Sequence, residues 1–199
     1  MHVSTLDPHA LIREAPALGS PPAVYRRLVD VLEDPRSGTH EVAAVVGQDT
    51  SLTARLLRLA NSAYFSFNGP VGSVHQAVGL IGAVHIRDLA LATSVTSHFQ
   101  DVPPDLIHLE EFWRHSLAVG IGARTIAELR RESNLERFFV AGMLHDVGRL
   151  VLYVCAPEPA REILEHAERH EVLLYEAEID LTGFDHGDVG GILMETWNM

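Results

Sequence analysis

The sequence contains no lysine and a single cysteine, and these two absences exclude several kinds of site. All 15 basic residues are arginine, so neither a Schiff-base lysine nor the lysine of a phosphate-binding P-loop is available. Cys155 has no second cysteine with which to form a disulfide within the chain, and one thiol cannot build a cysteine zinc cage. We expect Cys155 to be a small buried apolar residue.

Positive charge is also scarce. The chain carries 27 Asp and Glu residues against 15 Arg, which gives a formal charge of −12. Nucleic-acid affinity rests on neutralising phosphates with basic side chains, so this balance predicts no DNA or RNA partner. The first twenty residues lack the apolar stretch of a signal peptide, and no run approaches the roughly 18 residues of a membrane span. We therefore expect a cytoplasmic protein with no membrane partner.

Hydrophobic periodicity is helical in nearly every segment, and we find no convincing alternating strand. The apolar fraction of 47% in 199 residues is enough to bury a substantial core. The predicted helices lie at about 20–34, 39–46, 51–61, 73–81, 83–98, 109–131, 135–154, 159–170, 174–182 and 185–197. Apolar positions expected to face the core include Leu80, Ile126 and Leu129. The sequence thus predicts an all-α fold.

A proline pair interrupts the helical pattern near the middle of the chain. The segment 100–106 contains Pro103 and Pro104 and is typical of a linker. We therefore expect an N-terminal helical lobe over residues 1–100 and a C-terminal helical lobe over residues 101–199.

Two histidines and an aspartate form the clearest candidate for a functional site. His115 lies on one predicted helix and the adjacent pair His145 and Asp146 on the next, so an antiparallel arrangement would bring them together. Two imidazoles and a carboxylate suit a divalent transition metal. Neighbours on a helix point about 100° apart, so a shared metal must lie between their directions. Gly148 would reduce bulk near such a pocket. The alternative is hydrogen-bonded core histidines with Asp146 as a local partner.

His186 could join this cluster from the start of the last predicted helix, or it could pack locally, which is the interpretation that we favour. The remaining histidines, among them His166 and His170, are interpreted as surface residues. The sequence contains no nucleophile elbow, paired catalytic carboxylate motif or glycine-rich phosphate loop. It therefore indicates no confident catalytic residue.

Two sets of residues carry a family resemblance. The segment 141–150, AGMLHDVGRL, preceded by FWRHS at 112–116, resembles the core of the HD superfamily of metal phosphohydrolases. The N-terminal half adds 52–64 and 77–82, which are similar to the HDOD branch of that superfamily. The likeness extends from about residue 16 to residue 197, with both halves in the expected order.

This resemblance implies a two-lobed, all-helical protein with an HD-like C-terminal lobe. It matches His115 to the first histidine of the HD pattern and His145 and Asp146 to the doublet. His186 is a looser match to a further histidine of some HD-GYP phosphodiesterases. Arg149 stands where those relatives usually have lysine, and their final metal-binding aspartate would lie on a helix beyond residue 199.

HDOD proteins are bacterial signalling modules, alone or joined to receiver and cyclic di-GMP-related domains, and most have lost part of the hydrolase metal site. The resemblance therefore favours a non-catalytic regulatory module that binds a protein or a small ligand and needs no cofactor. The alternative is a metal-dependent phosphohydrolase or phosphodiesterase holding iron, manganese or zinc. Asn61, Ser62 and Arg149 are candidates for a ligand site or a lobe interface. A homo-oligomer formed through exposed apolar surface is a third hypothesis.

Overall fold

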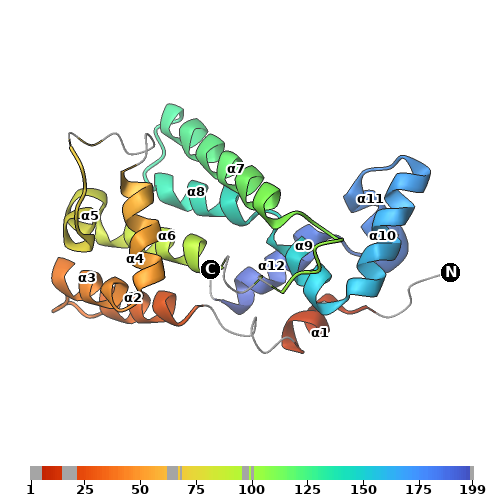
Figure 1. The fold of residues 1–199 in the computed structure, drawn as a ribbon, viewed down its shortest axis with the longest axis horizontal. Coiled ribbons are helices and arrows are strands. Elements are labelled where there is room, and N and C mark those ends of the chain that lie inside the picture. Colours follow the sequence, from red (N-terminus) through yellow and green to blue (C-terminus); the bar gives the residue numbers. More distant parts are fainter. Residues whose placement is uncertain are drawn as a thin grey trace. The chain divides into compact units, whose positions relative to one another are not determined.

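The chain folds entirely as helices in its described part, which confirms the predicted all-α class (Figure 1). The structure, a computed structural model, describes residues 6–14, 22–61, 67, 69–95, 99 and 101–197. Its helices are α1 (Pro8–Arg13), α2 (Ala23–Glu33), α3 (Thr39–Gly47), α4 (Thr50–Ala60), α5 (Val74–Ile81), α6 (Ala83–Val95), α7 (Leu109–Leu129), α8 (Leu135–Leu144), α9 (Val147–Cys155), α10 (Pro157–His170), α11 (Leu174–Thr182) and α12 (His186–Thr196). Within those ranges there is no strand.

The helices form two compact units. One unit contains residues 1–20, 98–119 and 142–199, and the other contains residues 21–97 and 120–141. The chain passes between the units near residue 97, close to the predicted linker, but it also does so after residues 20, 119 and 141. The division into two helical lobes at residue 100 stays a prediction.

In the unit that contains α2 to α6, α6 packs against both α2 and α4, and α3 packs against α5. Its fully buried side chains include Leu28, Leu52, Leu56, Ile86 and Leu89. In the other unit, α9 packs against α12, α10 and α1. Leu150, Tyr153 and Leu193 are buried at this second core. Helix α1 was not predicted, because its six residues are too few for a periodic signal.

Three predicted core positions are wrong. Leu80 is 49% exposed, Ile126 61% and Leu129 80%. On α7 the buried face instead contains Ser116 and Ala127. Phe112, earlier on the same helix, is buried, but Ser116 and Ala127 give little hydropathy signal, so the stripe in the second half of α7 was placed one residue out of phase, which is a rotation of about 100°.

The predicted continuous helix over 135–154 is also wrong, because it is interrupted between α8 and α9. His145 and Asp146 lie at this break, and Asp146 has φ −101° and ψ 8°, outside the helical region. No glycine or proline marks the interruption in the sequence. The two candidate site residues are therefore presented by a turn and not by a helix face.

The stretch Arg137–Cys155 meets the length and composition of a membrane span, with a mean hydropathy of 1.5. The sequence-based expectation that no run is long enough for a span is therefore wrong. The stretch is 61% buried within the structure, as core helices of soluble proteins are. One such stretch is weak support for a span, and the compartment stays a prediction. Cys155 at its end is half-buried, and burial raises the pKa of its thiol.

The start of α5 has the predicted N-cap. The Ser73 hydroxyl accepts a hydrogen bond from the backbone N–H of Gln76 at 3.1 Å, whereas the Gln76 amide oxygen accepts from the backbone N–H of Gly72. We expect Ser73→Ala to lower the free energy of unfolding by about 1 kcal/mol, as loss of an N-cap does. Urea denaturation checks this value. Ser73→Asp keeps an acceptor at the cap, so an equal loss in that variant would contradict the explanation.

Candidate functional site

The structure brings together three of the four residues predicted to bind a metal. His115 on α7 and the pair His145 and Asp146 at the α8–α9 break each offer one ligand atom, and these atoms all lie within 4.8 Å of one another. All three residues belong to the same compact unit. The two histidines are exposed and Asp146 is half-buried, so the group is open to solvent on one side.

The break between α8 and α9 explains how adjacent residues can serve one site. At this turn His145 Nε2 lies 3.1 Å from Asp146 Oδ1. The rings of His115 and His145 have centroids 5.4 Å apart. Ligand atoms around a four-coordinate ion with bonds of 2.0–2.2 Å are about 3.4 Å apart, so small side-chain movements would close this group around an ion.

The hydrogen bonds of His145 determine which ring nitrogen is available. Nδ1 lies 2.8 Å from the carbonyl oxygen of Gly142, which can only accept, so Nδ1 carries the hydrogen. In the neutral ring the lone pair of Nε2 therefore faces the carboxylate of Asp146. Two acceptors at this distance repel each other unless a proton or a cation lies between them. A histidine that donates one N–H to a backbone carbonyl is typical of metal ligation.

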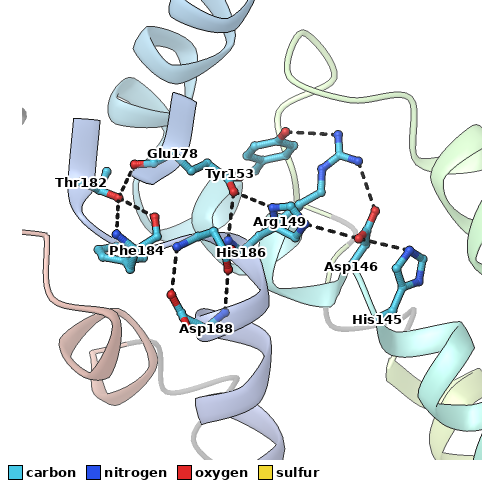
Figure 2. A network of polar contacts seen from close by, with 10 residues as sticks. His145, Asp146, Arg149, Tyr153, Glu178, Thr182, Phe184, His186 and Asp188 are labelled. Atoms are coloured by element: carbon cyan, nitrogen blue, oxygen red, sulfur yellow. Dashed lines mark hydrogen bonds and ion pairs between the residues drawn. The ribbon is translucent and has the colours of Figure 1, made fainter. Parts of the chain in front are cut away.

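Asp146 interacts with cationic groups on two further sides (Figure 2). Its Oδ2 is 3.3 Å from Arg149 Nη1, and its Oδ1 is 3.5 Å from His186 Nε2. Burial alone would raise the pKa of Asp146, but the interactions with His186, His145 and Arg149 outweigh it and lower the pKa to about 2. The carboxylate is therefore ionised, as a metal ligand must be.

His186 lies beside this group and is not among the three residues whose ligand atoms all lie within 4.8 Å of one another. Its Nδ1 is 2.5 Å from Glu178 Oε2, and its Nε2 faces Asp146 (Figure 2). Burial lowers the pKa of His186, yet the two carboxylates more than offset that effect and raise it to about 9. The structure places His186 as a link between Asp146 and Glu178.

Glu178 is a component of the site that our sequence analysis missed. It is 1% exposed, and its Oε2 also accepts the backbone N–H of His186 at 3.0 Å. This carboxylate thus lies at the N-terminus of α12, where helix partial charges favour an anion. The signal available in the sequence was one acidic residue at a core position of α11. The sequence does not show that the partner of this carboxylate is His186, because the turn between α11 and α12 brings the two residues together.

Gly148 has a different role from the predicted one. A Cβ at this position would overlap the carbonyl oxygen of His186 and lie 2.7 Å from the backbone nitrogen of Gly190. Gly148 therefore lets α9 and α12 approach each other, and it does not create space in a pocket. This close approach holds His186 next to Asp146.

Arg149 points from α9 toward Asp146 on one side and Tyr153 on the other. Its Nη2 donates to the Tyr153 hydroxyl at 3.4 Å. Its Nε is buried and has no hydrogen-bond partner among the described residues. Arg149 thus brings a largely desolvated positive charge to the edge of the His115 group.

Asn61 lies in the other unit, at the end of α4. Its side-chain amide donates to the carbonyl oxygens of Leu57 at 2.7 Å and Val71 at 2.9 Å, and its oxygen accepts from the Val71 N–H at 2.8 Å. These bonds fix the chain before α5 and give Asn61 a structural role at the C-terminal end of α4. Ser62 lies outside the described residues.

Solved structures of other bacterial proteins share this fold, among them the following two. An HDOD domain protein of unknown function from Geobacter sulfurreducens is 30% identical, has a TM-score of 0.76, and is matched over 96% of this chain and 65% of that chain. A protein of Shewanella amazonensis SB2B with the provisional name phosphohydrolase is 28% identical, with a TM-score of 0.77, over 96% of this chain and 67% of that chain.

A curated relative, an uncharacterized protein from Treponema pallidum (strain Nichols), is 21% identical over 182 residues. The match covers 89% of this chain but 35% of that protein, so the chain spans about a third of its length. The family model of the HDOD domain matches residues 18–199. The resemblance seen in the sequence is thereby confirmed, and the chain belongs to the HDOD domain family.

Proposed function

We propose that this chain is a bacterial signal-transduction module in which His115, His145 and Asp146 hold one divalent transition-metal ion. The ion would create a binding site for a small anionic ligand, and no turnover of that ligand is required. One observation carries this proposal: one ligand atom from each of His115, His145 and Asp146 lies within 4.8 Å of the others, and His145 Nε2 is 3.1 Å from Asp146 Oδ1. A shared cation would use all three donors.

The charges around the site support an anionic ligand. Asp146 and Glu178 are balanced by Arg149 and protonated His186, so these four groups sum to zero. A dication would make the site positive within a chain of formal charge −12. Three protein ligands leave coordination positions open, and the exposed histidines place them toward solvent. A phosphate or carboxylate oxygen suits such a position.

Two points favour a regulatory role: the chain belongs to the HDOD family, and the carboxylates of Asp146 and Glu178 both form ion pairs. Asp146 and Glu178 are both paired to cations, so neither is free to act as a base. Their contacts hold the site in one arrangement, as a binding module requires. We propose receiver or cyclic di-GMP-related domains as partners, in the cytoplasm, with self-association as an alternative.

A second candidate is a metal-dependent phosphohydrolase. It is favoured by the proximity of His115, His145 and Asp146, and by the provisional name of the Shewanella amazonensis protein. A bound ion would supply a Lewis acid for phosphoryl oxygens and acidify a bound water.

Metal content of protein purified without an affinity tag tests the proposal. We expect near-stoichiometric iron, manganese or zinc in the wild type and a metal content close to zero at this site in His145→Ala. The matched control is His108→Ala, an exposed histidine before α7, which should leave the content unchanged. Wild-type protein without a metal that also takes up none on dialysis would contradict the proposal.

A screen of phosphomonoesters and phosphodiesters then separates the two candidates. The loaded wild type should show no hydrolysis above that of His145→Ala, while a small anion should bind only to the loaded wild type. Hydrolysis that disappears in His145→Ala and persists in His108→Ala would favour the phosphohydrolase.

A further inference from the structure

Helices α10 and α11 carry two histidines and an aspartate whose side chains lie near one another, away from the His115 group. The two helices pack against each other within one compact unit and are joined by residues 171–173 (Figure 1). Glu171 ends α10 in the left-handed region, with φ 55°, and thereby turns the chain back. Residues near the end of α11 consequently lie beside the second half of α10.

This arrangement gathers two imidazoles and a carboxylate. His166 and His170 are four residues apart on α10, and their ring centroids are 4.3 Å apart with the planes inclined at 41°. Asp180 on α11 places its Oδ2 3.8 Å from His166 Nε2. Side chains at positions i and i+4 share one helix face, which explains why the two rings lie against each other, with Asp180 beside His166.

We propose that His166, His170 and Asp180 form a second binding site, for Zn²⁺. Two histidines at i and i+4 on one helix face can bind the same zinc ion, and zinc accepts imidazole nitrogen and carboxylate oxygen. The three ligand atoms do not all lie within 4.8 Å of one another, as those of the His115 group do, so Asp180 must rotate toward the ion, which its 64% exposed side chain allows. Water completes the tetrahedral set.

The electrostatic surroundings favour a dication at this position. His170 lies in the last turn of α10, where unpaired carbonyl groups give the helix end a partial negative charge. Glu162, Glu168 and Glu171 are exposed on the same part of the chain. The one arginine in that turn, Arg169, is 3.7 Å from Glu165 and is thus partly neutralised.

An ion in this site would connect α10 to α11 directly. Because the unfolded chain does not hold the three ligands together, Zn²⁺ would bind the folded form preferentially and raise its melting temperature. The effect is independent of the His115 group and of the function proposed for it. Our interpretation of His166 and His170 as isolated surface residues overlooked their i, i+4 spacing.

Zn²⁺ titration by calorimetry tests the site, in the full chain carrying His145→Ala so that the first group is disabled. We expect one Zn²⁺ per chain in this variant and a rise in melting temperature on zinc addition. Both should be lost when His166→Gln and His170→Gln are added, and zinc binding should be weaker with Asp180→Asn. His108→Gln in the same background is the matched control and should retain the binding.

Cu²⁺ as a spectroscopic probe gives an independent readout. The electron paramagnetic resonance spectrum should show coupling to two imidazole nitrogens in the His145→Ala variant, and this coupling should disappear with His166→Gln and His170→Gln. The proposal is overturned if the His145→Ala chain binds Zn²⁺ only at millimolar concentration, or if binding survives loss of both histidines. Should His145→Ala fail to fold, His115→Ala provides the same background.

Discussion

Glu178→Ala is expected to lower the free energy of unfolding by about 3–5 kcal/mol, because it removes one partner of a buried ion pair. Glu178 is 1% exposed and lies 2.5 Å from His186 Nδ1. Without it, protonated His186 retains only Asp146, at 3.5 Å, and its backbone N–H at the start of α12 loses its acceptor. Urea denaturation followed by circular dichroism measures the loss.

Asp180→Ala is the matched control, since Asp180 is on the same helix and also faces a histidine. It is exposed and 3.8 Å from His166, so its removal should cost less than about 1 kcal/mol. Glu178→Gln keeps an acceptor for His186 and should fall between the two. Equal losses in Glu178→Ala and Asp180→Ala would mean that burial of the Glu178–His186 pair contributes nothing.

The same variant also tests how Asp146 is positioned. His186 reaches Asp146 from α12, and Glu178 fixes the orientation of the His186 ring. If His115, His145 and Asp146 bind a metal, Glu178→Ala should weaken that binding about 10–100-fold, as loss of outer hydrogen bonds does elsewhere. Unchanged metal affinity in a folded Glu178→Ala protein would show that His186 does not position the ligand.

Much of the helical pattern could be predicted from local signals. The bounds of α11 agree with the prediction, and α12 begins at the predicted N-cap, where Asp185 accepts from the Asp188 N–H at 3.0 Å. These helices have strong start or stop signals nearby. The break before α9 could not be predicted, because its interruption involves His145 and Asp146, which disrupt no helix by their own propensity.

The candidate site was predictable to the extent that it depends on a linear motif. The spacing of His115 from the His145 and Asp146 pair was enough to predict their proximity. The partners of Asp146 were not, because Glu178 and His186 come together only through the packing of α9, α11 and α12. A sequence shows which side chains are ionisable, whereas their pairing depends on helices that approach each other in three dimensions.

Gly148→Ala is expected to lower the free energy of unfolding by about 3 kcal/mol, the upper part of the usual range for overpacking. The added Cβ would overlap the backbone carbonyl of His186 and lie 2.7 Å from the backbone nitrogen of Gly190, and helix backbones cannot rotate away as side chains can. Alanine favours helix by roughly 1 kcal/mol over glycine, which offsets only part of this cost.

Gly191→Ala, with nothing within 4 Å of its new Cβ, is the matched control and should be neutral or stabilising. At about 2–4 °C per kcal/mol for a chain of this size, the two variants should differ clearly in melting temperature. Equal melting temperatures would mean that α9 and α12 can separate at little cost, and that the contact between His186 and Asp146 does not depend on Gly148.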